Sequence, residues 1–298
     1  MSRREFCCVL AGSVAATGLL PPLLQARILE ASTDEDIFSF INRTVGKFDP
    51  VTYQQIIGAA NEFKEGDGIL GVAAQNDAVR VRARMLLSNT KISDLLKHPL
   101  FEDRLYSILT DNLPARLLQK TGKMTVGELK AFLLEREETD IRPMLEGLTS
   151  DVIGCVVKIL SNEELTAVGR KIFNPLPGTN IGARGYLGAR IQPNSPTDHP
   201  DDVIWQIFSG WSYATGDVVL GTNPVSSLPE SVATLETALN DIRQTFGVED
   251  ILPHSVLAHI DIQADVEKRQ PGTTGIWFQS LAGSDKANAT FDLTLDKM

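Results

Sequence analysis

Short apolar runs alternate with longer amphipathic stretches in the last part of the chain. The clearest run, residues 217–220, is rich in β-branched side chains and stops at Gly-Thr-Asn-Pro, residues 221–224. This pattern is typical of a fully buried strand, because Pro224 has no N–H to continue a ladder. Apolar side chains then recur at helical spacing at Val232, Leu235, Leu239, Ile242 and Phe246, before Gly247. The sequence predicts a βα unit with Asn223 at the carboxyl end of its strand. Ser227 and Glu230 have the spacing of a capping box.

Three more units of the same kind surround it. Their strands are predicted at residues 186–191, 255–260 and 275–280. A helix with Val203, Ile204, Ile207, Phe208 and Trp211 on one face follows the first of these strands. Consecutive βα units require parallel strands and right-handed crossovers. The predicted fold class is therefore α/β, with about four βα units forming the first half of a TIM (β/α)8 barrel. An open four-stranded sheet is the structural alternative.

The chain before this region is predicted to be helical. Helices are expected to begin at or near Asp49, Thr90, Met124 and Thr149, with a further helix over residues 72–87 and a break at residues 66–68. We therefore divide the chain into a leader at 1–26, a helical N-terminal region at 27–175 and a partial (β/α) barrel at 176–298. Arg80, Arg82 and Arg84 alternate with core positions, which favours a solvated face over an anion site.

The leader has the pattern of a twin-arginine export signal. Arg3 and Arg4 precede Phe6, no charged residue follows until Arg27, and Leu24-Gln25-Ala26 resembles a cleavage site. The expected location is periplasmic or exported if this signal is used, and cytoplasmic otherwise. A membrane anchor or a misassigned start are the alternatives.

Charge and cysteine content narrow the possible functions. The chain has 298 residues and a formal net charge of −10, and no basic stripe appears, so we expect no nucleic-acid partner. Cys7 and Cys8 lie in the leader, which leaves Cys155 alone, on the apolar side of a helical pattern. We expect a buried thiol there. No Cys/His spacing suggests a metal site.

Polar side chains follow each predicted strand. They are Arg190, Gln192 and Asn194 at the first, Asn223 at the second, His259 and Asp261 at the third, and Gln279 and Ser280 at the fourth. Arg donates through a rigid fork, while Asn and Gln both donate and accept. The set suits a small polar molecule with hydroxyl and amine groups. It contains no nucleophile–base pair, and His259 is expected to be a core histidine in preference to a ligand or base.

Four segments, in this order, resemble one known family. They are Arg-Ile-Gln-Pro-Asn at 190–194, Gly-Thr-Asn-Pro-Val at 221–225, Val-Leu-Ala-His at 256–259 and Phe-Gln-Ser-Leu-Ala-Gly-Ser at 278–284. Upstream, residues 65–67, 71–74 and 147–151 extend the likeness. Together they resemble the large subunit of ethanolamine ammonia-lyase over roughly residues 48–298.

This resemblance implies a barrel enzyme that uses adenosylcobalamin. Cleavage of the cobalt–carbon bond in that family gives a deoxyadenosyl radical, which takes hydrogen from ethanolamine and leads to acetaldehyde and ammonia. By the same likeness, Arg190, Gln192 and Asn223 would hold the hydroxyl and amino groups of ethanolamine or a similar small amino alcohol. Pro224, Gln279 and Ser280 would contact the corrin. The resemblance assigns no catalytic residue, and it implies an ammonia-lyase small subunit as partner and an oligomeric assembly.

The large subunits of this family continue through four more βα units, which include a Phe-Glu-Thr-Gly-type motif with a substrate-binding Glu, and a later Asp. This sequence stops at Met298, so we expect it to be an N-terminal part completed by a second chain. Two other functions are open: a non-catalytic exported remnant that binds a small amine or a corrinoid, and a structural scaffold piece.

Overall fold

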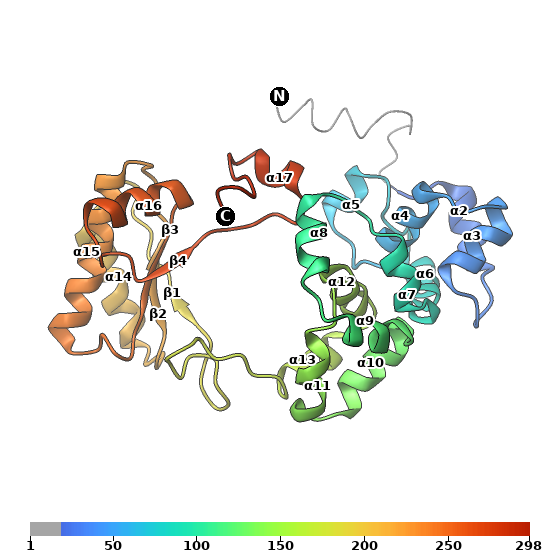
Figure 1. Ribbon diagram of the computed structural model, residues 1–298, viewed down its shortest axis with the longest axis horizontal. Helices are drawn as coiled ribbons and strands as arrows, with labels where there is room; N and C mark the ends of the chain where they lie inside the picture. The colour runs from blue at the N-terminus through green and yellow to red at the C-terminus, as the bar shows by residue number, and fades with distance from the viewer. Residues whose placement is uncertain (1–18) are drawn as a thin grey trace. The chain divides into compact units, whose positions relative to one another are not determined.

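The computed structural model describes residues 19–298. The chain divides into two compact units, one ending at Ile172 and one spanning Phe173–Met298 (Figure 1). No helix within the described residues is both long enough and apolar enough to cross a bilayer.

The first unit is helical and has its own apolar core. Its helices are α2 (Pro22–Leu29), α3 (Ile37–Val45), α4 (Pro50–Ala59), α5 (Glu65–Ile69), α6 (Asp77–Asn89), α7 (Ile92–Lys97), α8 (Arg104–Asp111), α9 (Ala115–Gly122), α10 (Val126–Glu135), α11 (Glu138–Leu145), α12 (Ser150–Ile159) and α13 (Asn162–Gly169). Phe40, Ile56 and Leu86 are among the fully buried side chains at its centre.

Side-chain caps explain where several of these helices begin. Asp49 accepts the backbone N–H of Thr52 at the start of α4. Thr125 and Glu128 form a reciprocal capping box at the start of α10, and Thr149 caps α12. Each cap satisfies a backbone donor that has no partner inside the helix. The helix starts predicted near Asp49, Met124 and Thr149 are confirmed.

Two predicted helix boundaries in this unit are wrong. The expected helix at 72–87 begins only at Asp77, because Gly71 has a left-handed backbone and Asn76 is the N-cap. The expected break at residues 66–68 lies inside α5.

The arginine side chains of α6 do not form a solvated face. Arg80 Nε donates to the carbonyl of Asn61 and Arg84 Nε to that of Ala60, both at 2.9 Å. These carbonyls lie at the end of α4, where backbone acceptors have no partner within the helix.

Cys155 is buried on α12, and burial raises the pKa of its thiol to about 11, as predicted for an inert core thiol.

The predicted leader is only partly covered by the structure. Arg3 and Arg4 lie outside the described residues, and the export signal stays a prediction. The expected cleavage site at 24–26 lies within α2, whose Gln25 is buried and donates to the carbonyl of Leu20.

The second unit contains a four-stranded parallel sheet. Its strands are β1 (Arg190–Ile191), β2 (Val219–Thr222), β3 (His254–Leu257) and β4 (Ile276–Phe278), paired in chain order. The helices that follow them are α14 (Pro200–Ser212), α15 (Pro229–Phe246), α16 (Ile260–Arg269) and α17 (Asp285–Ala289). The prediction of consecutive βα units with parallel strands is confirmed.

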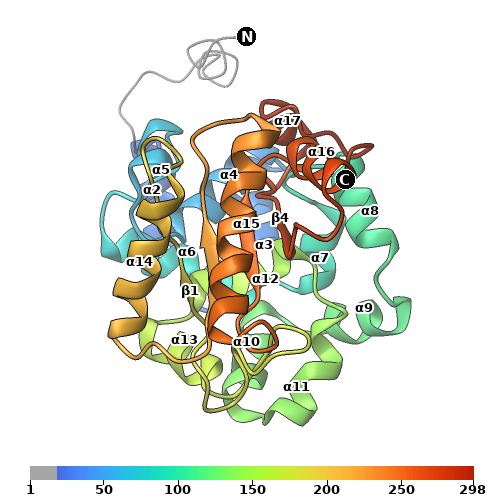
Figure 2. The same cartoon turned by 90° about the vertical axis from the view of Figure 1, so that its left-hand side faces the viewer.

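Helices α14, α15 and α16 cover one face of the sheet (Figure 1). Figure 2 looks onto α14 and α15, which pack side by side. Leu220 and Val256 are fully buried and share one apolar cluster with Val203 and Leu235 of these helices. Because side chains alternate along a strand, Gly221 and Ser255 belong to the opposite face.

Strands β1, β3 and β4 are shorter than predicted, and β2 lies two residues later than the run predicted at 217–220. Only residues 190 and 191 of the expected first strand are paired: turns with positive φ angles at Gly182 and Gly185 lead up to residue 186, and residues 187–189 have no regular structure. The third strand ends at Leu257, since residues from Ile260 onward form α16. The fourth strand loses one residue at its start and two at its end.

The predicted capping box at the start of α15 is also wrong. The N-cap is Leu228 and makes no side-chain cap. Glu230 instead forms an ion pair with Arg269 of α16.

Helix α15 buries one carboxyl group completely. Glu236 is 0 % exposed. One of its oxygens accepts the hydroxyl of Thr274 at 3.1 Å, and the other has no partner. Burial raises the pKa of Glu236 from 4.5 to about 7, and the charge of Glu267 adds to this shift. A buried carboxyl with one unpartnered oxygen favours its neutral form.

This buried acid predicts a specific pH dependence of stability. Between pH 4.5 and about 7 the folded state binds the proton of Glu236 more tightly than the unfolded state, so stability falls as pH rises through this window. Relative to Glu236→Gln, the parent should lose about 2–3 kcal/mol of unfolding free energy between about pH 5 and pH 8. Urea unfolding at several pH values measures this. Glu230→Gln, on the exposed side of the same helix, is the control. If the difference in unfolding free energy between the parent and Glu236→Gln does not vary with pH, Glu236 is ionised in the folded protein over this range.

Candidate functional site

Parallel pairing brings the ends of the four strands to one edge of the sheet, here called the carboxyl edge. Gln192, Asn223, Ala258 and Gln279 each lie directly after a strand at this edge. Open parallel sheets and barrels place their binding sites at this edge. Three of these four residues are side-chain amides, so the edge has both donors and acceptors.

Arg190 lies across the neighbouring strand. Its Nη2 is 3.3 Å from the carbonyl oxygen of Thr222 in β2 and 3.5 Å from that of Ser255 in β3. Its guanidinium carbon stands 5.0 Å from the centre of the Phe278 ring in β4, within cation–π range. The side chain therefore spans the sheet on the face opposite the helices.

Gly221 makes this path possible. A Cβ at position 221 would lie 2.1 Å from Nε of Arg190. Glycine inside a strand is a known sign of close approach by another group, so Gly221 is the sequence signal for the path of Arg190.

The side chains of Arg190 and Gln192 contact each other. The Nη1 group of Arg190 donates to Oε1 of Gln192. Nε of Arg190 is buried and has no partner. Burial lowers the pKa of Arg190 from its usual value, although a guanidinium stays protonated in proteins.

Asn223 follows β2 directly, next to the Thr222 carbonyl that Arg190 contacts. Its Oδ1 is buried and has no hydrogen-bond partner among residues 19–298. A buried acceptor without a partner is costly, and such groups are rare in native structures. The carboxyl edge thus carries an unpartnered donor on Arg190 and an unpartnered acceptor on Asn223.

The three residues predicted to contact a corrin lie at the same edge. Pro224 follows Asn223 and is half-buried, and Ser280 is exposed in the loop after β4. The amide of Gln279 already has partners: its Oε1 accepts the N–H of Ile260 at 2.8 Å, and its Nε2 donates to the carbonyl of Ser280.

His259 is neither a free ligand nor a core histidine. Its Nδ1 accepts the N–H of Asp261 at 3.3 Å, which caps α16, and its Nε2 is 3.2 Å from the carbonyl oxygen of Phe291. Within residues 19–298 no group of three or more His, Cys, Asp or Glu side chains could hold a metal ion.

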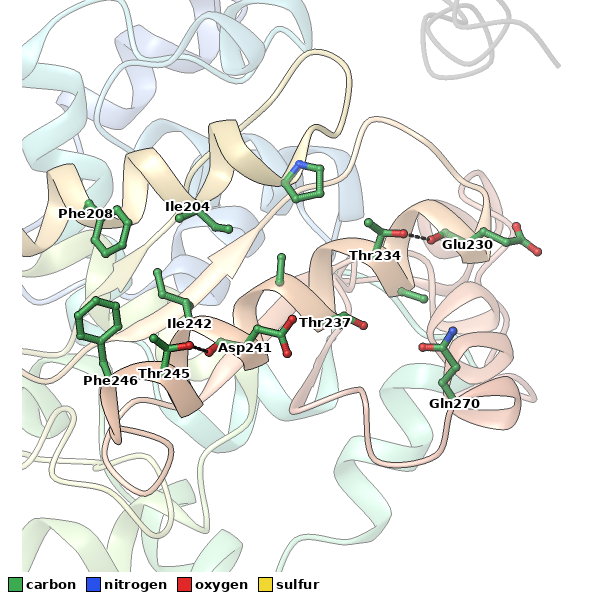
Figure 3. Close-up of a pocket in the computed structure, with 13 residues that line it drawn as sticks. Ile204, Phe208, Glu230, Thr234, Thr237, Asp241, Ile242, Thr245, Phe246 and Gln270 are labelled. Atoms are coloured by element: carbon green, nitrogen blue, oxygen red, sulfur yellow. Dashed lines mark hydrogen bonds between the residues drawn. The ribbon is translucent and has the colours of Figure 1, made fainter.

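A groove of about 710 Å³ lies elsewhere, between α14, α15 and the end of α16 (Figure 3). Ile204, Phe208 and Phe246 form one end of it. Two of its threonine hydroxyls donate to carbonyls of their own helix, Thr234 to Glu230 and Thr245 to Asp241. No residue predicted for the site lines this groove. We therefore place the candidate site at the carboxyl edge, where polar groups are left without partners.

Comparison with known proteins gives one family. The model of the family described as "Ethanolamine ammonia lyase large subunit (EutB)" matches residues 47–298. The ethanolamine ammonia-lyase large subunit of Salmonella typhimurium is 31% identical over 249 residues, which cover 81% of this chain and 54% of the relative. The large subunit from Escherichia coli K12 matches with the same identity and coverage. The chain spans about half the length of the curated relatives it matches.

The contact between Gly221 and Arg190 can be tested with one methyl group. In Gly221→Ala the new Cβ should displace the guanidinium from its path across β2, because the two would overlap. We expect the Arg190 Nε–H to exchange with water at least about tenfold faster and stability to fall by about 1 kcal/mol. Arginine side-chain NMR and urea unfolding measure these effects. The control is Gly154→Ala in α12, where an added Cβ meets nothing within 4 Å and should stabilise the helix by about 0.5–1 kcal/mol. Unchanged Nε–H exchange in Gly221→Ala would contradict the described path of Arg190.

Proposed function

The chain belongs to the family of ethanolamine ammonia-lyase large subunits, and from this we propose that the carboxyl edge of its sheet binds a small amino alcohol. The observation that supports the proposal is the pair of buried polar atoms without partners, Nε of Arg190 and Oδ1 of Asn223. An amino alcohol has the matching groups. Its hydroxyl oxygen can accept from Arg190, and its ammonium can donate to Asn223.

We propose that Gln192 completes the hydroxyl contact. Its Oε1 holds Arg190, which leaves its amide N–H groups available to the same hydroxyl oxygen. Both side chains come from the end of β1, so they are positioned by the strand and not by a flexible loop. The activity that we propose is that of the family: cleavage of the carbon–nitrogen bond of ethanolamine, giving acetaldehyde and ammonia.

We also propose that adenosylcobalamin binds over the carboxyl edge. The loops after β2 and β4 expose apolar side chains there, Val225, Leu228 and Leu281, next to Pro224 and Ser280. A broad, partly apolar group such as a corrin fits this combination. Gln279 would have to release the N–H of Ile260 before its amide could contact the corrin. When bound, the cofactor supplies the radical chemistry, while this chain supplies position and electrostatics.

The substrate's ammonium also needs a negative partner. Two carboxylates in the segments that follow β1 and β3 already have partners. Asp198 accepts backbone N–H groups of the loop after β2, and Asp261 pairs with Lys297 at 2.7 Å. We therefore propose that a carboxylate from outside the described residues completes the site, because an unmatched buried cation is costly.

The sheet itself supports a place for that carboxylate. Strand β4 pairs on one side only among the described residues, and helices cover one face of the sheet. We propose that β1–β4 are half of a (β/α)8 barrel, because sequential parallel strands with helices on one face are the repeating unit of that fold. The remaining strands would add at the β4 and β1 edges.

Asn223→Ala tests the binding site. Loss of the amide acceptor should weaken ethanolamine binding by about 1–3 kcal/mol, because the ammonium loses a hydrogen bond in a buried place. Titration calorimetry on the folded variant measures this. The matched control is Asn162→Ala, at an exposed position of α13, which should bind like the parent. Equal affinity of Asn223→Ala and the parent would contradict the proposed role of this side chain.

Turnover tests the need for an added carboxylate. With adenosylcobalamin and ethanolamine, this chain alone should produce no acetaldehyde above background, because the carboxylates of Asp198 and Asp261 are already engaged. Adding a fragment of a related large subunit that covers the other half should raise acetaldehyde formation. An intact large subunit assayed in parallel is the positive control. Robust turnover by the chain alone would refute the proposed missing carboxylate, and binding without turnover in any combination would favour the non-catalytic alternative.

A further inference from the structure

Asp198 links two loops of the carboxyl edge. It lies in the loop between β1 and α14, where it is 9% exposed. Its Oδ1 accepts the backbone N–H of Val225 at 2.8 Å, and its Oδ2 accepts the N–H of Ser226 at 2.7 Å and the hydroxyl of Ser231 at 3.1 Å. One carboxylate thus binds the loop between β2 and α15 at two points and the first turn of α15 at a third. Hydrogen bonds to an ionised carboxylate are among the stronger ones in proteins.

Another hydrogen bond joins the loop after β1 to the last residue of β2, on the other side of Asn223. The hydroxyl of Thr222, which is buried, donates to the carbonyl of Pro193 at 2.8 Å. Asn223 and Pro224 are therefore bracketed, by Thr222 before them and by Val225 and Ser226 after them. Because Pro224 fixes its own φ angle, the backbone around Asn223 has little remaining freedom.

Asp198 is itself held in place. Its backbone has a φ of 54°, a left-handed conformation that Asp tolerates better than most residues. Its N–H donates to the carbonyl of Ser195 at 3.3 Å. The buried Ser195 hydroxyl accepts the N–H of His199 and donates to Asp202 in the first turn of α14. The carboxylate is thus fixed to the start of a helix.

These hydrogen bonds on both sides of Asn223 are consistent with its unpartnered oxygen. A side-chain amide in a mobile loop would rotate until its buried oxygen found a donor, since leaving it unpaired is costly. A restrained backbone limits the positions from which this oxygen can reach a donor. Asp198 supplies two of the three bonds that join residues 222–226 to the loop after β1, and its third bond reaches Ser231 in α15.

We propose that Asp198 is a positioning residue, which holds the loop after β2 so that the Asn223 amide oxygen remains available to a ligand. The inference rests on the proposed function, because it takes Asn223 as the contact to the substrate's ammonium. Asp198 does not touch the substrate. It acts through the backbone of residues 225 and 226.

The binding test is a double-mutant cycle with Asp198→Asn and Asn223→Ala. Asp198→Asn keeps the shape but places an amide N–H₂ against a backbone N–H, so ethanolamine affinity measured by calorimetry should fall on the order of tenfold. The double variant should bind no more weakly than Asn223→Ala alone, because Asp198 acts through that side chain. Asp201→Asn, an exposed neighbour in the first turn of α14, is the matched control and should bind like the parent. Additive losses in the double variant would overturn the proposal.

A second measurement tests the role of Asp198 even if the protein binds no amino alcohol. That outcome would refute the proposed function but not the positioning role of Asp198. In the ligand-free protein, Asp198→Asn should speed amide hydrogen exchange at Val225 and Ser226 by at least about tenfold. It should also shift the Asn223 side-chain amide signals, while Ile207 in α14 exchanges as before. Unchanged Asn223 signals, or equally faster exchange at Ile207, would show a merely structural role. Ser231→Ala removes only one of the three bonds and should give a smaller change of the same kind. If Asp198→Asn does not fold, Ser231→Ala takes its place. In that case, unchanged exchange at Val225 and Ser226 in Ser231→Ala would contradict the proposal.

Discussion

The absence of a side chain at Gly221 is the constraint on which the rest of the candidate site depends. Arg190 can cross β2 only over this glycine. From there it reaches the carbonyls of Thr222 and Ser255 and the ring of Phe278. A single side chain therefore contacts three strands of the four-stranded sheet beyond its own. The contact fixes the guanidinium relative to the whole carboxyl edge, which is how a rigid sheet can present a charge at a defined place.

Two carboxyl groups and one guanidinium of the second unit differ in how far their hydrogen-bonding atoms have partners. Both carboxylate oxygens of Asp198 accept hydrogen bonds, from two N–H groups and one hydroxyl. Arg190 has partners for its terminal nitrogens but none for Nε. Glu236 has one partner and a pKa raised to about 7. Asp198, whose two oxygens both accept hydrogen bonds, has a structural role. The guanidinium of Arg190 lies where a ligand is proposed to bind, and a ligand can supply the partner that its Nε lacks.

Local pattern predicted much of this molecule. The β-branched run before Gly221 and the helical period through Ile242 predicted the β2–α15 unit, and polar residues at strand ends pointed to Arg190, Gln192 and Asn223. Family membership was inferred from short segments and is confirmed by the comparisons. Some errors have local causes: turns precede the short first strand, and Gly71 and Asn76 delay the helix expected at 72–87. Others, the capping box at Ser227 and the solvated arginines of α6, were assigned from near neighbours in sequence, whereas contacts with Arg269 and with the end of α4 decided them. Asp198 escaped notice for the same reason, since its partners lie 27 or more positions away.

The way Asp198 recognises its neighbouring loop has a consequence for sequence divergence. Two of its three bonds are to main-chain N–H groups, at Val225 and Ser226, and every residue except proline carries such a group. The identities of residues 225 and 226 can therefore drift without breaking the link, while position 198 requires an acidic side chain that also accepts a left-handed backbone. Relatives that share few residues in this loop can keep the same geometry around the asparagine, so variation in the loop is a poor guide to variation in the site.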